Sequence, residues 1–157
     1  MSFTQRIFGS SLGRKYVMAI SGALLLVFLV VHMSGNLLVL KGPDAFNDYG
    51  HFLKTHPQLL WPARIGLLVL FVLHIYLGIS LARENRAARP TPYASKNTVQ
   101  ATLASRTMAL TGLLIFAYLV YHLLHFTIGV VQPQYFSGVD AQGRHDIFTM
   151  FVLGFRD

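Results

Sequence analysis

The sequence predicts an all-α integral membrane protein with three transmembrane helices. Of its 157 residues, 54% are hydrophobic and only 12% are charged, about half the charged fraction of an ordinary soluble domain. Three long apolar runs divide the chain, and each is long enough to cross a bilayer. Backbone N–H and C=O groups in lipid must be satisfied within their own segment, so each run is predicted to be a helix.

The three spans are predicted at residues 17–39, 62–82 and 109–131, and Arg64 is their only charged residue. At about 1.5 Å per residue, each run matches a hydrocarbon core about 30 Å thick. A turn at residues 41–44 begins a short helix, residues 44–54, which we expect at the outer membrane interface. Residues 88–97 are predicted to form an extended linker, and the whole chain, residues 1–157, is predicted to be one transmembrane domain.

The distribution of basic residues predicts a cytoplasmic N-terminus. Two regions that share one side, the N-terminal tail and the loop between the second and third spans, contain Arg6, Arg14, Lys15, Arg83, Arg86, Arg89, Lys96 and Arg106. The opposite side contains Lys41, Lys54, Arg64, Arg144 and Arg156. The side richer in Lys and Arg is normally cytoplasmic. The net charge is +7, but the basic residues flank apolar runs. We therefore expect the chain to be surrounded by membrane lipid and to have no nucleic acid partner.

Four histidines lie within the predicted spans: His32, His74, His122 and His125. The chain has no cysteine, which excludes disulfides, thiolate zinc sites and iron–sulfur ligation. One such histidine alone could equally be a neutral side chain bonded to a neighbouring helix. Imidazoles on all three spans, with no Asp, Glu or Lys among them, favour bis-imidazole haem ligation over a proton relay, which usually includes carboxylates.

The depths of these histidines predict two levels of haem. From the span midpoints, His32 and His122 lie about 6 Å and about 3 Å to the outer side, and His125 about 7 Å. The second helix runs the other way, which puts His74 about 3 Å to the inner side. His32 can therefore share an iron with the third helix, where depth alone accepts either His122 or His125. His74 is left at an inner level.

Glycines near these levels are candidate clearances for a porphyrin. Gly22 precedes His32 by ten residues and Gly112 precedes His122 by ten, which places both glycines at the inner level. Gly35 follows His32 by about one turn and is a candidate clearance for the outer haem. A helix position without a side chain admits a flat ring. Close helix packing through small residues explains the same glycines equally well.

Three histidine-containing stretches then suggest a family. Residues 31–36 (VHMSGN), 73–78 (LHIYLG) and 121–126 (YHLLHF) resemble the di-haem cytochrome b membrane-anchor subunit of succinate dehydrogenases and fumarate reductases. Residues 45–53 (AFNDYGHFL) look like the connection after the first helix of that family. The resemblance covers nearly the whole chain and implies the first three helices of a five-helix bundle that holds two haems b.

The resemblance implies roles for individual residues. His32 and His122 would ligate the outer haem iron, and His74 would ligate the inner one. It favours His122 over His125, which would instead contact a haem propionate or a quinone. The family's fourth ligand lies on a fourth helix, and this sequence ends at Asp157 before such a helix. We expect a truncated chain, the alternative being that another subunit completes the inner site.

The function implied is electron transfer in respiratory complex II, which serves the tricarboxylic acid cycle and the respiratory chain. Flavoprotein and iron–sulfur subunits on the cytoplasmic face of the bacterial inner membrane would supply electrons from succinate. The haems would pass them to a quinone, menaquinone in many members. The subunit itself would not be catalytic for succinate. Alternatives are a quinol-linked cytochrome b of another dehydrogenase, a haem-free anchor, and a transporter with a histidine relay.

Overall fold

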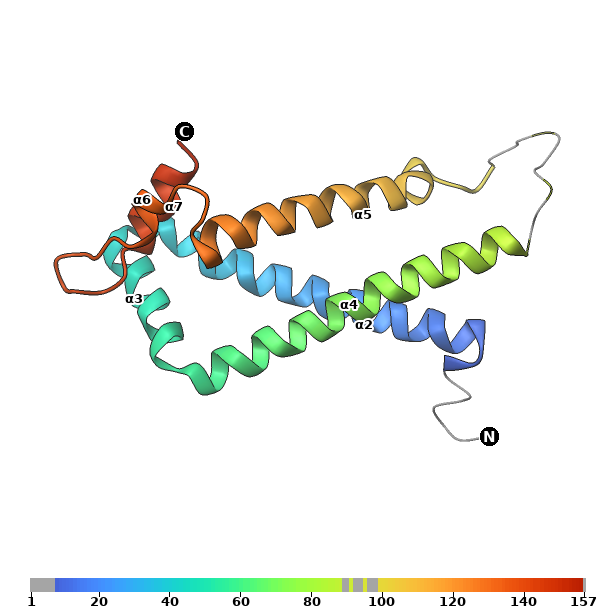
Figure 1. Cartoon of the computed structure of the whole chain (residues 1–157), viewed down its shortest axis with the longest axis horizontal. Coiled ribbons are helices and arrows are strands. Elements are labelled where there is room, and N and C mark those ends of the chain that lie inside the picture. The colour runs from blue at the N-terminus through green and yellow to red at the C-terminus, as the bar shows by residue number, and fades with distance from the viewer. Residues whose placement is uncertain (1–7, 89–90, 92–94, 96–98, 157) are drawn as a thin grey trace. The chain divides into compact units, whose positions relative to one another are not determined.

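The computed structural model describes residues 8–88, 91, 95 and 99–156 (Figure 1). Its helical elements are α2 (Ser11–Asn36), the 3₁₀ segment η1 (Leu37–Lys41), α3 (Pro43–Thr55), α4 (Pro57–Ala87), α5 (Leu103–His122), the π-helical segment η2 (Leu123–Ile128), α6 (Pro133–Phe136) and α7 (Ile147–Gly154). These residues contain no strand, only one isolated bridge between Val139 and His145. The predicted all-α class is confirmed.

Three helical stretches are long and apolar enough to span a membrane, as predicted. They are Ser11–Lys41, Pro57–Ala87 and Leu103–Ile128. Within their most apolar parts, 0%, 11% and 0% of the residues are buried inside the protein. Apolar side chains exposed in this way are compatible with lipid, or with further helices, around a multi-pass membrane protein.

The helices begin earlier than the apolar runs because capping residues set their ends. Ser10 precedes α2, and its Oγ accepts a hydrogen bond of 3.0 Å from the backbone N–H of Gly13. Thr102 caps α5 in the same way, accepting from the N–H of Ser105 at 3.2 Å. Pro57 opens α4, where its fixed φ suits the first helical turn. Hydropathy locates the part of a helix that suits lipid, whereas these caps determine where each helix starts.

The third stretch ends at Ile128, before the predicted residue 131. Gly129 there adopts a left-handed conformation with φ of +78°, and its N–H bonds the carbonyl oxygen of Leu124 at 3.0 Å. A Cβ on Gly129 would lie 2.2 Å from the Phe136 ring. Only glycine therefore fits both the backbone angle and the space at this turn.

The short elements also follow the sequence pattern. The predicted helix at residues 44–54 corresponds to α3 (Pro43–Thr55), although its place at a membrane interface stays a prediction. The apolar run near the C-terminus forms α7, which at eight residues is too short to span. Most of the predicted linker 88–97, including Arg89 and Lys96, lies outside the described residues, as does Arg6.

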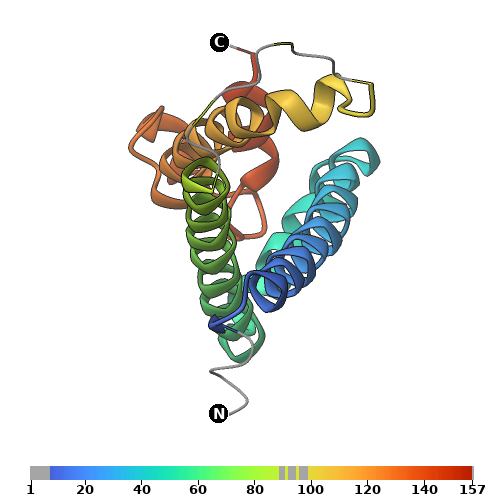
Figure 2. The ribbon, with the colours of Figure 1, turned by 90° about the vertical axis from the view of Figure 1, so that its right-hand side faces the viewer.

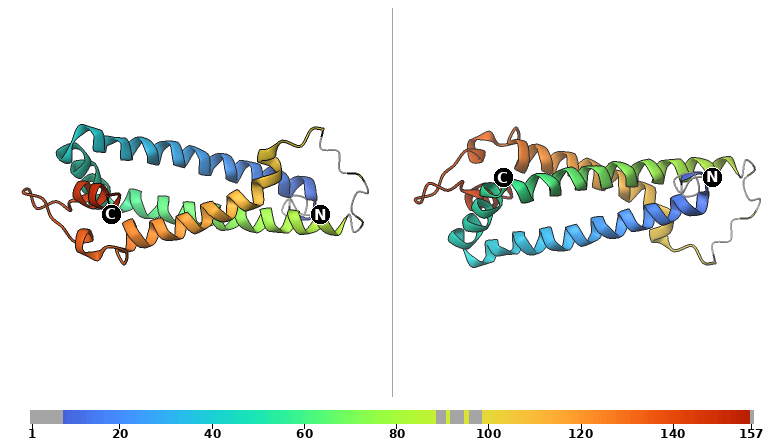
Figure 3. Two further views of the ribbon diagram at one scale, coloured as in Figure 1. Left: turned by 90° about the horizontal axis from the view of Figure 1, so that it is seen from above. Right: turned by 90° about the horizontal axis from the view of Figure 1, so that it is seen from below.

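The chain divides into two compact units, so the single-domain prediction stays a prediction. The described residues of the first unit fall within 8–38 and 52–91, and those of the second within 39–51 and 95–156. The first unit is built on α2 and α4, which lie side by side (Figure 2). The second contains most of α3 together with α5, η2, α6 and α7, and Figure 3 shows α7 beside α3.

In the first unit, α2 and α4 run antiparallel in a defined register. Arg14 near the start of α2 forms a two-pronged ion pair with Glu84 near the end of α4, with Nη2 and Oε2 2.7 Å apart. Arg14 also donates to the Oγ of Ser80 at 3.3 Å. Leu77 and Leu81 on α4 are buried. The pair is thus held by a buried apolar contact and by a charged clamp at one end.

Candidate functional sites

His74 on α4 makes its polar contacts with α2. Its Nδ1 lies 3.1 Å from the carbonyl oxygen of Met18 and 3.1 Å from the Oγ of Ser21. A carbonyl oxygen only accepts hydrogen bonds, so Nδ1 carries the ring proton and donates it. When the ring is neutral, its lone pair is then on Nε2. Metal-bound histidines commonly show this arrangement, in which one nitrogen bonds the protein and the other ligates.

Gly22 lets the His74 ring approach α2 closely. A Cβ at position 22 would lie 3.0 Å from the Cε1 of His74, tighter than ordinary contact. The space beside Gly22 is therefore taken by the imidazole, as expected of small-residue helix packing. By contrast, a Cβ on Gly112 would meet no atom within 4 Å. The roles of Gly22, Gly35 and Gly112 as haem clearances stay predictions.

His125 is enclosed by its own part of the chain. It is 3% exposed, and its Nε2 donates to the amide oxygen of Gln132 at 2.9 Å. The ring stacks on Phe126 at 4.0 Å between centroids, and a Cβ on Gly154 would lie 3.0 Å from its Nε2. Phe126 belongs to the π-helical segment η2, Gln132 to the turn after it, and Gly154 to α7. The predicted contact of His125 with a propionate or quinone is not tested by these contacts.

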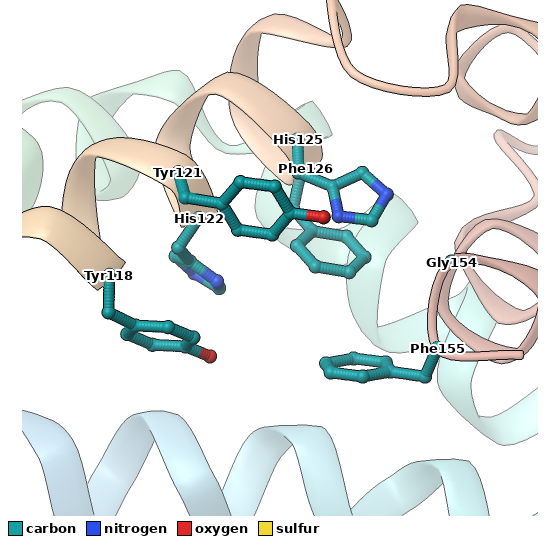
Figure 4. A pocket seen from close by; sticks show the side chains of 7 residues that line it. All are labelled: Tyr118, Tyr121, His122, His125, Phe126, Gly154 and Phe155. Atoms are coloured by element: carbon teal, nitrogen blue, oxygen red, sulfur yellow. The ribbon is translucent and has the colours of Figure 1, made fainter. Parts of the chain in front are cut away.

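His122 lies one turn earlier and lines a pocket (Figure 4). The imidazole is half-buried, and the Tyr118 ring stacks beside it with 5.8 Å between ring centroids. Figure 4 shows the His122 ring next to the Tyr118 ring, with Phe155 on the other side of the pocket. The remaining walls come from Tyr121, His125, Phe126 and Gly154. The pocket is thus mostly aromatic, and two imidazoles are among its lining residues.

His32 occupies the other end of α2 from Arg14 and is exposed within this chain. Its ring stacks with Phe28, with 5.2 Å between centroids. Asn36 donates from its side chain to the His32 carbonyl oxygen at 2.8 Å. Because His32 belongs to the first unit and His122 to the second, their pairing on one iron stays a prediction.

The second unit also contains a charged cluster that sequence analysis missed, here called the acidic cap and formed by Asp44, Asp48, Asp140, Asp146 and Arg144. Arg144 bonds Asp140 at 2.7 Å and Asp44 at 2.9 Å, and it also pairs with Asp48. These hydrogen bonds, first of all that to Asp140, raise the pKa of Arg144. Burial raises the pKa of Asp140, but the hydrogen bonds from Arg144 and Asn47 outweigh it, and the net pKa is lowered.

Asn47 ties the acidic cap to two helices. This α3 residue is 1% exposed. Its amide donates to Asp140 at 3.2 Å and to Asp146 at 3.1 Å, and its oxygen accepts from the N–H of Phe148 at 2.9 Å. Asp146 in turn caps α7 by accepting from the N–H of Thr149. One amide thereby joins α3, the loop that follows α6, and α7.

No three His, Asp or Glu side chains gather as a metal site within the part of the chain that the structure describes. Haem ligation by two imidazoles needs no such cluster. Comparison with known proteins finds no matching family model and no similar curated protein or solved structure. A functional assignment therefore depends on the chemistry of the histidines and on the resemblance of the segments around them.

Proposed function

We propose that this chain is the haem b-containing membrane anchor of a succinate:quinone oxidoreductase, passing electrons between an iron–sulfur subunit and membrane quinone. The observation on which the proposal depends is the presence of imidazoles on all three spanning helices. Those apolar stretches contain no Asp, Glu or Lys between residues 17–39, 62–82 and 109–131. The segments around His32, His74 and His122 supply the resemblance to this enzyme rather than to another cytochrome b.

The state of His74 fits a haem ligand. Its Nδ1 is committed to the Met18 carbonyl and Ser21, which leaves the Nε2 lone pair for an iron at the predicted inner level. A histidine with a purely structural role could make the same hydrogen bonds through Nδ1. The contact therefore supports haem ligation by His74 but is also compatible with a structural role. The proton on Nδ1 also fixes the orientation of the ring about its bond to α4.

The contrast between His122 and His125 supports His122 as the outer ligand, with His32 as its partner. The Nε2 of His125 already donates to Gln132, so ligation through that atom would break a buried hydrogen bond. His122 instead lines the aromatic pocket with Tyr118 and Phe155. These rings would exclude water around the ligand position, and His125 remains the candidate contact for a propionate or quinone.

Haem b, when bound, supplies a one-electron carrier at each level. The chain's own residues hold and orient the imidazoles and keep their surroundings apolar. The proposal includes a cytoplasmic N-terminus in a bacterial inner membrane and menaquinone as the quinone. It also includes flavoprotein and iron–sulfur partners at the cytoplasmic face, where Arg83, Arg86 and Arg106 would lie.

A reduced-minus-oxidised optical spectrum of the detergent-purified chain tests this proposal. We expect b-type bands, and the part due to the outer haem should be lost when His32 and His122 are both replaced by alanine, while binding of the inner haem and membrane insertion are retained. A spectrum without b-type bands would favour a histidine-relay transporter or a haem-free anchor. Co-purification from native membranes tests the enzyme: a partner other than a succinate-oxidising flavoprotein would identify a cytochrome b of another dehydrogenase.

A further inference from the structure

We propose that Ser21, together with the Met18 carbonyl, is the positioning group that fixes His74 as an Nε2 ligand. The inference rests on the proposed function, because it assigns a task to a residue beside a proposed haem ligand. It adds that α2 sets the ring tautomer and orientation of a ligand that α4 provides. Ser21 is 2% exposed, and its hydroxyl contacts the Met18 carbonyl and His74.

The three groups admit one consistent arrangement of protons. The Ser21 hydroxyl donates to the Met18 carbonyl at 2.9 Å. The Nδ1–H of His74 then donates to that same carbonyl and to the Ser21 Oγ, both at 3.1 Å. If Ser21 instead donated to an unprotonated Nδ1, a ring lone pair would face the carbonyl oxygen at 3.1 Å. That repulsive contact would replace two favourable ones in a buried place.

The surrounding contacts hold the ring against α2. Gly22 leaves space for it, since a Cβ there would lie 3.0 Å from the His74 Cε1. Leu77, less than one turn along α4, is fully buried, and the Arg14–Glu84 ion pair fixes the register of the two helices. A ligand held by a second helix in this way has its orientation defined before any iron is present.

The ring tautomer is measured directly by ¹⁵N NMR of histidine-labelled, haem-free chain in lipid nanodiscs. The His74 signals are identified by their absence from His74→Gln. We expect a protonated Nδ1 and an unprotonated Nε2. A protonated Nε2, or a ring that averages both tautomers, would overturn the inference. This measurement does not depend on haem content.

The ligand role is tested by titrating haem into the full chain with His32 and His122 replaced by alanine, so that His74 provides the remaining proposed ligand. Ser21→Ala should weaken this binding by about tenfold, the lower end of the usual loss when a ligand's hydrogen-bond partner is removed, because the Met18 carbonyl stays. Ser21→Thr should largely restore binding, since a threonine hydroxyl can bond the same i−3 carbonyl.

Ser34→Ala is the matched control. Ser34 also lies on α2 and donates to a carbonyl of its own helix, that of Val30 at 2.8 Å, but it lies about 20 Å along the helix from Ser21. Its removal should leave haem affinity unchanged. Equal affinity in Ser21→Ala and in the parent would overturn the positioning role. Absence of haem b from every variant and from the unmodified chain would overturn the proposed function and the ligand role together, whatever the tautomer.

Discussion

Replacing Asn47 should weaken the docking of α7 on α3. The buried side chain makes two hydrogen bonds to carboxylates and one to a backbone N–H. A bond between neutral groups contributes about 1 kcal/mol and one to a charged group about 1.5–3 kcal/mol. Asp140 keeps Arg144, and Asp146 keeps Thr149, when Asn47 is lost, so the lower values apply. We expect Asn47→Ala to destabilise the docking of α7 by about 4 kcal/mol.

Hydrogen–deuterium exchange of the protein in nanodiscs measures this change. The Phe148 amide and the α7 amides exchange when that segment opens locally. A destabilisation of about 4 kcal/mol should speed their exchange by roughly a thousandfold. Asn47→Asp should be at least as damaging, because it removes the donor and places another carboxylate beside Asp140 and Asp146.

Asn36→Ala is the control for this measurement. Asn36 also makes a side-chain hydrogen bond, but to the His32 carbonyl of its own helix at 2.8 Å. It should change α7 exchange by less than about threefold, as expected of substitutions away from the affected contact. If Asn47→Ala changed α7 exchange as little as Asn36→Ala does, the three hydrogen bonds would not hold α7, and the reasoning would be wrong.

Three further predictions concern the second unit. His122→Ala should remove the outer haem b, whereas His125→Ala should retain it and speed amide exchange in the following turn; the opposite optical result would exchange their proposed roles. Gly129→Ala should destabilise that turn by about 2 kcal/mol or more, because it combines a strained φ with a clash, and thermal unfolding checks this. The lowered pKa values of Asp140 and Asp146 stabilise the cap above the ordinary carboxyl pKa of about 3.9. This contribution should disappear as the pH falls through the lowered pKa values, and the α7 amides should then exchange faster. If their exchange rate, corrected for the intrinsic pH dependence, stayed constant from about pH 6 to about pH 3, the prediction would be contradicted.

The three long helices could be predicted from the sequence because lipid imposes a simple pattern. An uninterrupted apolar run of this length has few other stable conformations in a bilayer. The ends could not be predicted as well, since Ser10 and Thr102 lie outside the apolar runs. Gly129 shortens the third stretch through its backbone angle, a property that hydropathy does not report.

The acidic cap was missed because its partners lie far apart in the sequence. Arg144 pairs with Asp44 and Asp48, about a hundred residues away, and Asn47 bonds residues at a similar separation. No periodicity links such positions, and single Asp or Asn residues in loops look like ordinary turn residues. The one local signal was the AFND stretch at residues 45–48, which sequence analysis used only as part of a family resemblance.

Helical rise predicts the depth of each candidate ligand but not the hydrogen bonds of its imidazole ring. Rise gives the depth of each imidazole, and on that basis His122 and His125 are both acceptable partners for His32. Which ring nitrogen is available depends instead on a neighbour: His74 donates through Nδ1 to Met18, whereas His125 donates through Nε2 to Gln132. Neither neighbour belongs to a histidine motif or alters an apolar pattern. Two histidines within the predicted spans therefore bond the protein through different ring nitrogens, and only their hydrogen-bond partners distinguish the two.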